Sequence, residues 1–303
     1  MYKKFLRPLA FALIGIATII CLSRFIAQPA PAHPWFNQFT QRPAGSSSPL
    51  VIAHADTSGT SPWPGDTMLF LENAAALGVD VLEMNVTMSK DGHIVLNHDI
   101  NVDDTSDGSG LISDMTLAEI KTLDAAYDWT PEGGSTFDYR GQGITFPTLD
   151  EVFQRFPAYP MVVEIKQESP SMAQPLCDLI RLFGMEEKVI VPSFSDLAMG
   201  EFRAACPEVA TAASSNEVKQ FVYLSFAFMS NPTTPPYFAM QVPIESAGIT
   251  VITPGFVANV HRRGLQIHAW TINDPDEMRM LIEMGVDGIM TDRPDVLLEV
   301  LGR

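Results

Sequence analysis

Short apolar runs alternate with amphipathic stretches along most of this chain. The amphipathic stretches carry helix caps and stops, such as Asp66 as an N-cap and Gly78 as a stop, and they predict helices. The apolar runs predict strands, because they are short and are bounded by turn residues. Helices are expected at 66–77, 116–123, 149–156, 171–183, 195–205, 217–228 and 275–284. Ten candidate strands lie at 50–53, 79–86, 94–98, 161–166, 189–192, 209–212, 238–242, 250–252, 266–272 and 288–290.

This β-then-α order predicts parallel strands, arranged as a closed barrel or as an open doubly wound sheet. Polar residues follow several strands at their carboxyl ends, and only in a closed barrel do these ends share one mouth. We therefore predict an α/β fold of the TIM-type (β/α)8 class. Two observations fit a purely parallel barrel of eight strands less well. Ten candidates exceed eight positions, and Asp91-Gly92 is typical of a hairpin turn, which a purely parallel barrel does not need.

The alternation is interrupted between residues 100 and 147, where Gly, Ser, Asp and Pro are frequent. This stretch is expected to form a small insertion after the third strand. The barrel is expected to span residues 49–303, preceded by a Pro/Ser/Gly-bearing linker at residues 33–48.

Residues 82–99 hold the clearest candidate site. Glu83 and Asn85 lie two apart in a predicted strand, so their side chains point to the same face. After the turn, the next apolar run delivers His98 and Asp99. A carboxylate, an amide oxygen and an imidazole at strand ends suit a hard-cation site with a proton carrier beside it.

Structural interpretations compete with functional ones at several positions. Lys166 can pair with Glu164 on one strand face, and Trp270 can be an ordinary packing residue. Asp292 and Arg293 are expected to form a structural ion pair or a helix cap. His54 and His98 can likewise be a pair of hydrogen-bonded core histidines. His93, His261 and His268 are assigned to structure or surface.

Residues 1–32 are typical of a targeting segment. Lys3, Lys4 and Arg7 precede a mostly apolar run of residues 9–22, and the segment 30–32 resembles a small-residue cleavage site. A cleaved signal peptide and an uncleaved N-terminal membrane anchor both remain open. In either case the basic residues stay on the cytoplasmic side, and the body is expected to be exported, periplasmic or extracellular.

The formal charge of the chain is -17. Residues 1–32 hold four basic residues and no acid, so the remainder carries 15 basic against 36 acidic residues, or -21. Such a body does not favour nucleic acid or anionic lipid as a partner. It binds a phosphate only where a metal or a few placed cations reverse the local field.

The three cysteines do not indicate a disulfide scaffold. Cys177 and Cys206 are expected to be small core residues, with a bridge between them left open in an oxidising compartment.

From Val51 to Pro294 the chain resembles the glycerophosphodiester phosphodiesterase family, whose barrel is similar to that of phosphatidylinositol-specific phospholipases C. The resemblance rests on segments in the family's order: VIAH, GVDVLEMNV, SKDGHIVLNHD, SDGSGLISDMTLAEIKTLDA, FPTLDEVF, VVEIK, AWTIND and GVDGIMTDRP.

The resemblance implies a phosphoric diester hydrolase with two acid/base histidines, one divalent cation and a phosphate-binding lysine. Transferred to this sequence, the acid/base pair is His54 and His98, the metal ligands are Glu83, Asn85 and Glu164, and the substrate-binding residues are Lys166 and Trp270. It also implies that a neighbouring hydroxyl of the substrate attacks first and gives a cyclic phosphate. The cation is expected to be Mg²⁺ or Ca²⁺, and the substrate a glycerophosphodiester or a lysophospholipid.

Four positions depart from the family pattern. Ala55 and Asp104 stand where an Arg is usual, and Asn85 stands where a third metal-ligating acid is expected. The usual Pro-Glu-Asn-Thr box is here Pro64-Gly65-Asp66-Thr67 and stands two residues further along the chain than usual. These departures support an alternative function, a catalytically impaired barrel that binds a phosphodiester or a lipid head group.

Overall fold

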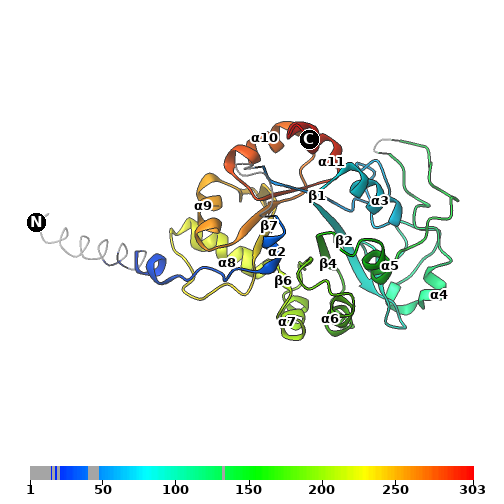
Figure 1. Ribbon diagram of the computed structural model, residues 1–303, viewed down its shortest axis with the longest axis horizontal. Coiled ribbons are helices and arrows are strands. Elements are labelled where there is room, and N and C mark those ends of the chain that lie inside the picture. The colour runs from blue at the N-terminus through cyan, green and yellow to red at the C-terminus, as the bar shows by residue number, and fades with distance from the viewer. Residues whose placement is uncertain (1–14, 16–17, 19–20, 40–47, 132–133) are drawn as a thin grey trace, which may run out of the picture.

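The computed structural model describes residues 15, 18, 21–39, 48–131 and 134–303 (Figure 1). Eight parallel strands form its centre, hydrogen-bonded in the order β6-β5-β4-β2-β1-β11-β10-β7. A bridge between Ala212 and Ala239 joins the two ends of this order, so the sheet is a nearly closed barrel. The strands are β1 (Leu50–Ala53), β2 (Val81–Met88), β4 (Met161–Ile165), β5 (Val189–Val191), β6 (Ala210–Thr211), β7 (Ala239–Val242), β10 (Gln266–Ala269) and β11 (Gly288–Thr291). The predicted TIM-type fold is confirmed.

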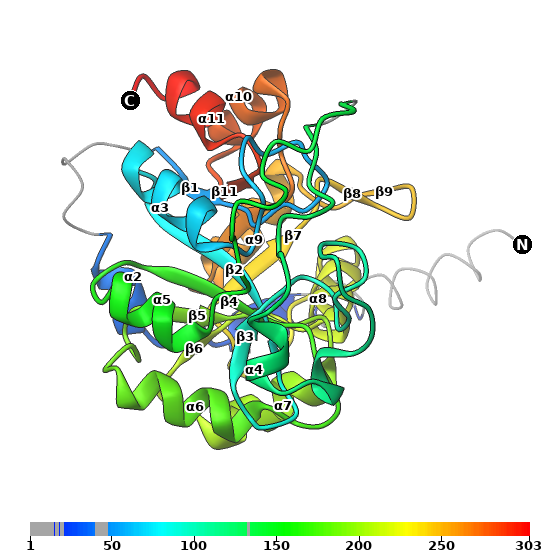
Figure 2. The same cartoon turned by 90° about the vertical axis from the view of Figure 1, so that its right-hand side faces the viewer.

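Helices surround the barrel and bury their apolar sides against it (Figure 2). Most begin at a side-chain cap: in α5, for example, Thr148 and Glu151 form a capping box. The surrounding helices are α3 (Met68–Leu77), α5 (Leu149–Arg155), α6 (Ala173–Leu182), α7 (Asp196–Ala205), α8 (Ser215–Phe226), α9 (Pro254–Arg262), α10 (Pro275–Met284) and α11 (Pro294–Val300). Two of them, α9 and α11, were not among the predicted helices.

Two of the ten candidate strands lie outside the barrel. β3 (Ile94–Leu96) pairs antiparallel with β2 through the turn at Asp91-Gly92. The candidate at 250–252 contributes only to β9 (Ile249–Thr250), which pairs with β8 (Glu245–Ser246) in an exposed hairpin (Figure 2). The remaining eight candidates are the eight barrel strands, which resolves the excess.

The insertion follows β3 and lies beside α3 and α5 (Figure 1). Its only described helices are a 3₁₀ turn, η1 (Ile112–Asp114), and α4 (Leu117–Ile120). It has a small core of its own, made of Val95, Val102, Ile112, Ile120, Ala125 and Phe146.

The end of the barrel opposite the mouth is closed by the chain that precedes β1. Helix α2 (Pro34–Asn37) places Trp35, which is fully buried, against the first inward residues of the strands, such as Leu50 and Val81. His33 caps this helix, and its Nε2 lies 3.0 Å from the carbonyl oxygen of Glu208. The prediction of a linker from residue 33 is thus wrong for residues 33–39. The Pro/Ser/Gly composition of the stretch concealed its aromatic residues, which pack into the barrel.

The predicted targeting segment, residues 1–32, lies mostly outside the described residues. None of the helices described for this chain is both long and apolar enough to span a membrane.

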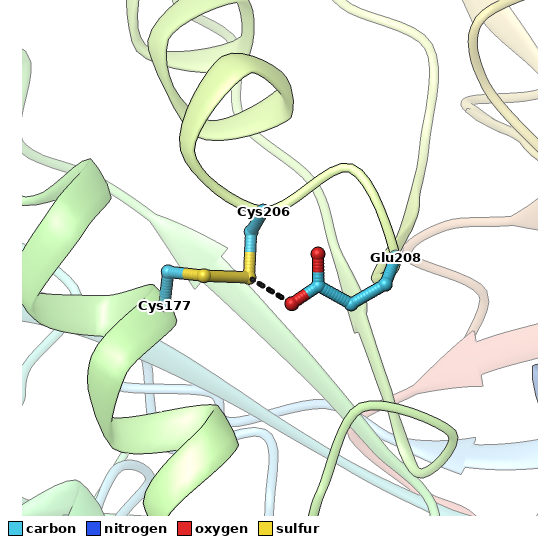
Figure 3. Close-up of side chains that lie close together, drawn as sticks. All are labelled: Cys177, Cys206 and Glu208. Atoms are coloured by element: carbon cyan, nitrogen blue, oxygen red, sulfur yellow. Dashed lines mark hydrogen bonds between the residues drawn. A yellow bond between two sulfur atoms is a disulfide. The ribbon is translucent and has the colours of Figure 1, made fainter.

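Cys177 and Cys206 form a disulfide that joins α6 to the end of α7 (Figure 3). Both cysteines are buried in the core, as expected, and the bridge that the sequence left open is present. Their Cα atoms lie 5.5 Å apart because α6 and α7 pack side by side, a proximity that sequence spacing could not show. The exposed Glu208 carboxylate lies 3.8 Å from Cys206 Sγ and pairs with Arg181. Within the described residues this is the one three-residue group of His, Cys, Asp or Glu compact enough for a metal, but its sulfurs are bonded to each other.

Candidate active site

A pocket of about 520 Å³ opens at the carboxyl ends of the barrel strands. Inward-facing positions recur every second residue along each strand, so side chains from distant parts of the chain converge there. The pocket combines charged groups with an apolar wall. The residues used below are His54, His98, Glu164, Lys166, Phe194, Val218, Lys219, Gln241, Val251 and Trp270.

His54 follows β1 and is fixed by residues that follow β10 and β11. Its Nδ1 lies 2.6 Å from Asp292 Oδ1, and the other oxygen of Asp292 accepts a hydrogen bond of 2.6 Å from Asn273. Asn273 Oδ1 in turn accepts from the backbone N–H of Asp292. Because this series of hydrogen bonds from Asn273 through Asp292 uses Nδ1 of His54, Nε2 is the ring nitrogen available to the pocket.

Burial alone would lower the pKa of His54. The hydrogen bond with Asp292 and the negative charges of Glu83, Asp292 and Asp56 outweigh it and raise the pKa to about 9. In this protein without a bound cation, the imidazole is therefore protonated at neutral pH and suited to give a proton.

Glu83, on β2, is 1% exposed, and its negative charge acts on His54. Its Oε2 accepts a hydrogen bond of 2.7 Å from the backbone N–H of Ala55. Burial raises the pKa of Glu83, and the charge of Glu164 adds to this, while the charges of His54 and Lys166 and the Ala55 N–H oppose it. A buried carboxylate in this setting is stabilised by any cation that enters.

Asn85 is also 1% exposed, and its amide nitrogen donates to Asp66 Oδ2 at 2.9 Å. The backbone N–H of Asn85 donates to the other oxygen of Asp66 at 2.8 Å. Asn85 Oδ1 is buried and has no hydrogen-bond partner among the described residues. The prediction that Asp66 is the N-cap of α3 is therefore wrong. Thr67 is the cap, and its side chain accepts a hydrogen bond from the N–H of Phe70.

Glu164 lies opposite Asn85 in the parallel register of β4 and β2, so the two side chains share the inner face. Lys166 Nζ is 2.9 Å from Glu164 Oε1, and it lies 5.8 Å from the centre of the Phe194 ring. The structural interpretation of Lys166, pairing with Glu164, is therefore present, and both residues also line the pocket. Within the described residues, Glu164 Oε1 has no partner of hydrogen-bond geometry.

His98 and Trp270 lie on the wall of the pocket. His98 follows β3, its side chain is 40% exposed, and its Nδ1 lies 3.1 Å from Asp99 Oδ1. Trp270 packs edge-on against Phe194 with ring centres 5.7 Å apart. His268, two residues earlier, is fully buried beneath the pocket between Gln241 and Gln266.

The residues present fit a hard divalent cation. Glu83, Asn85 and Glu164 converge from two adjacent strands. The buried Asn85 Oδ1 has no hydrogen-bond partner among the described residues, and Glu164 Oε1 is held by its ion pair with Lys166. Carboxylate and amide oxygens are the ligands that Mg²⁺ and Ca²⁺ prefer.

The structure thus brings all seven predicted site residues to one end of the barrel. Sequence reasoning missed the roles of Asp66 and Lys219. The prediction that Asp292 forms a structural ion pair with Arg293 or a helix cap is wrong, because Asp292 pairs with His54 and Arg293 pairs with Asp295. Asp292 had a usable signal, since it follows the last barrel strand at the same end as His54. Lys219, on α8, had none, because nothing in a surface helix indicates that it borders a pocket.

The structure shows the surroundings of two positions that depart from the family pattern, Gly65 and Asp104. A side chain at Gly65 would place its Cβ 2.3 Å from the carbonyl oxygen of Asp56, so the loop before α3 excludes the usual glutamate there. Asp104 lies with Gly65 and Trp129 at a small cavity of about 10 Å³, separate from the mouth pocket.

Taken together, fold and site define a (β/α)8 barrel with a histidine–aspartate pair and buried carboxylates near its mouth. Residues 58–296 match the glycerophosphoryl diester phosphodiesterase family. The chain belongs to this family of phosphoric diester hydrolases.

Three proteins that are similar to this chain serve as examples. A glycerophosphodiester phosphodiesterase of Caldanaerobacter subterraneus subsp. tengcongensis is 30% identical over 259 residues, 83% of this chain and 97% of the relative. A lysophospholipase D of Mus musculus is 26% identical over 318 residues, covering 97% of this chain and 93% of that protein. The structure of an Oleispira antarctica phosphodiesterase in complex with its product sn-glycerol-3-phosphate is 24% identical, with a TM-score of 0.63, and covers 85% of this chain and 98% of that one.

Proposed function

We propose that this protein hydrolyses glycerophosphodiesters to glycerol 3-phosphate and an alcohol, with one Mg²⁺ or Ca²⁺. The observation that carries the proposal is His54, held by Asp292 at a pocket that Glu164 and Lys166 also line. Glu83 and Asn85 lie buried on β2, the strand that pairs with the strand of Glu164. The Oleispira antarctica protein, with the same fold, holds such a product.

The chemistry divides among these residues. His54, protonated at neutral pH, gives its proton to the leaving alkoxide as the P–O bond breaks. His98 takes the proton of the attacking hydroxyl, which belongs to the substrate in the first step and to water in the second. Lys166, with Lys219 on the same pocket, attracts the phosphate despite the acidic body.

Glu83, Asn85 and Glu164 are the residues that would hold the cation. When bound, the cation neutralises charge on the non-bridging phosphate oxygens. A cation held by Glu164 would replace Lys166 as the partner of this carboxylate, and the Lys166 ammonium would then be available to the phosphate.

Substrate size is the second part of the proposal. The pocket wall formed by Phe194, Val218, Val251 and Trp270 is apolar and extends to the β8–β9 hairpin. This wall gives room for an acyl chain, and the mouse relative is a lysophospholipase D. Lysophospholipids are therefore proposed as substrates beside the water-soluble glycerophosphodiesters.

The test is a single assay on residues 33–303. Release of glycerol 3-phosphate from glycerophosphocholine is measured with Mg²⁺, Ca²⁺ or EDTA, and lysophosphatidylcholine is assayed in parallel. Activity that requires a cation and falls on the order of 10²-fold or more in His54→Ala and His98→Ala supports the proposal. His93→Ala, which changes an exposed histidine, is the matched control.

A stable barrel that binds glycerophosphocholine without turnover under any cation would instead support the alternative, a binding protein. The departures Ala55, Asn85 and Asp104 motivate that outcome.

We also propose that the body is exported, as a cleaved or an anchored protein. The basic and apolar residues 1–32 support this, and so does the Cys177–Cys206 disulfide, since disulfides persist in oxidising compartments. Protease added to intact spheroplasts should digest the body, whereas full protection would overturn export.

A further inference from the structure

The amide of Asn85 is held in one orientation by a residue far from it in sequence. Asp66 accepts two hydrogen bonds from this one residue, from the backbone N–H and from Nδ2. An ionised carboxylate can only accept, so the nitrogen of the amide faces Asp66 when Asp66 is ionised. Burial and the charge of Glu83 raise the pKa of Asp66 to about 8, and a cation bound nearby would favour the ionised form. The amide oxygen is thereby turned the opposite way, into the site, where it is buried and has no hydrogen-bond partner among the described residues.

The backbone at Asp66 is adapted to this contact. Its φ is 53°, in the left-handed region, and its side chain is buried. The preceding Gly65 donates its N–H to the carbonyl oxygen of Asp56 and has no room for a side chain. The loop therefore delivers the Asp66 carboxylate specifically to Asn85, although a positive φ is costly for a residue other than glycine.

Acid and amide have exchanged places relative to the family pattern. Where the usual Pro-Glu-Asn-Thr box has its Asn, this chain has Asp66, and where a third metal-ligating acid is expected it has Asn85. The structure shows these two positions in direct contact. The pair keeps one carboxylate and one amide, with their positions reversed.

We propose that Asp66 is a positioning residue that orients Asn85 as an oxygen ligand, so that the exchanged pair retains the cation site. This inference rests on the proposed cation-dependent function and explains how a neutral residue can stand in a ligand position.

The test compares four proteins: wild type, Asp66→Asn, Asn85→Asp and the double exchange Asp66→Asn/Asn85→Asp. Asparagine tolerates a positive φ, so Asp66→Asn changes the acceptor without new backbone strain. Binding of Mg²⁺ and of Ca²⁺ is measured by titration calorimetry, and the melting temperature is followed against each metal.

In Asp66→Asn one side-chain oxygen must serve two donors, so the Asn85 amide loses its fixed orientation. Cation affinity should fall on the order of tenfold or more. In Asn85→Asp two carboxylates face each other, so the cation-free protein should melt lower and gain more from added metal. The double exchange restores one acid and one amide and should bind the cation within a few-fold of wild type. That rescue would not occur if Asp66 only supported the loop.

Asp80→Asn is the matched control. Asp80 also accepts a backbone hydrogen bond, from Val51 N–H, but lies at the opposite end of the barrel. The Asp80→Asn variant removes the same charge as Asp66→Asn and should leave the cation affinity unchanged.

The outcomes separate the two proposals. Wild-type affinity in Asp66→Asn, or a double exchange as weak as that single variant, would overturn the positioning role while leaving the cation site intact. A wild-type protein that binds neither cation would overturn both.

Discussion

Asp292 gives His54 its orientation and most of its basicity. The two residues are 238 positions apart, and the parallel pairing of β1 with β11 brings them together. Asn273 holds the second oxygen of Asp292, so the carboxylate cannot turn away. The imidazole is thereby presented to the pocket in one orientation, with Nε2 facing the pocket.

Asp292→Asn should lower kcat on the order of 10²-fold or more with little effect on KM. The amide cannot stabilise the imidazolium as a carboxylate does, and the pKa of His54, measured by NMR, should fall. Arg293→Ala is the control, because Arg293 pairs with Asp295 and not with the site. A wild-type kcat in Asp292→Asn would remove Asp292 from the catalytic assembly.

His268 should make the protein acid-sensitive. Burial lowers the pKa of His268 to about 4, against 6.5 for an exposed histidine. Between these values the unfolded chain binds a proton that the folded protein does not, so the free energy of unfolding falls as pH drops from 6.5 towards 4. Over this whole pH range, the proton uptake of His268 in the unfolded chain should lower the free energy of unfolding by about 3 kcal/mol.

The measurement is urea unfolding at several pH values. His268→Gln should flatten the loss of stability across this window. His261 serves as the control, because its pairing with Asp287 raises its pKa, and its contribution is therefore constant below pH 6.5. An unchanged acid slope in His268→Gln would contradict the prediction.

For single residues, the sequence predicted which residue types form the site and which strand face they occupy, but not which side chains they contact. Glu83 with Asn85, and Glu164 with Lys166, were placed correctly on inner faces because a strand has a period of two. The contact of Asp66 with Asn85 could not be anticipated, since it depends on a left-handed residue in an irregular loop.

Helix α2 stabilises the closed end of the barrel. It covers the closed end of the barrel and fills its interior with Trp35, which touches no solvent. The strands there carry small inward residues, such as Ala210 and Ala239, which leave room for one large side chain.

Trp35→Ala should lower the free energy of unfolding by about 3–5 kcal/mol, because it leaves a cavity in a packed core. Phe25→Ala is the control, since Phe25 is 86% exposed and should change stability by less than about 0.5 kcal/mol. Denaturant midpoints measure both. Equal midpoints for Trp35→Ala and wild type would show that α2 is not part of the folded barrel.

Local pattern predicted eight barrel strands and most helices because each must bury one apolar face. It could not separate barrel strands from β3 and β9, which carry the same composition but pair antiparallel. Helix α9 did carry a signal, Thr253 as a cap before Pro254, but the weak apolar runs around it obscured the pattern.

The molecule as a whole is strongly acidic, with -21 over residues 33–303. Its field opposes the approach of an anionic substrate, and only the local cations of the pocket reverse it.

Raising ionic strength from about 10 mM to about 150 mM shortens the screening length from about 30 Å to about 8 Å. The kcat/KM for anionic glycerophosphoglycerol should therefore rise, while that for zwitterionic glycerophosphocholine should change little. Initial rates at fixed cation concentration measure both. A parallel response of the two substrates would show that the distributed charge does not influence association.

The position of α2 also sets the polarity of the molecule. The chain enters the barrel at the end where Trp35 closes it, and the pocket opens at the other end. Anything that holds the polypeptide ahead of residue 33, whether a bilayer or a chromatographic bead, is thus attached behind the catalytic opening. A tethered copy would turn its opening away from the support and take its substrates from the surrounding fluid, not from the surface that carries it.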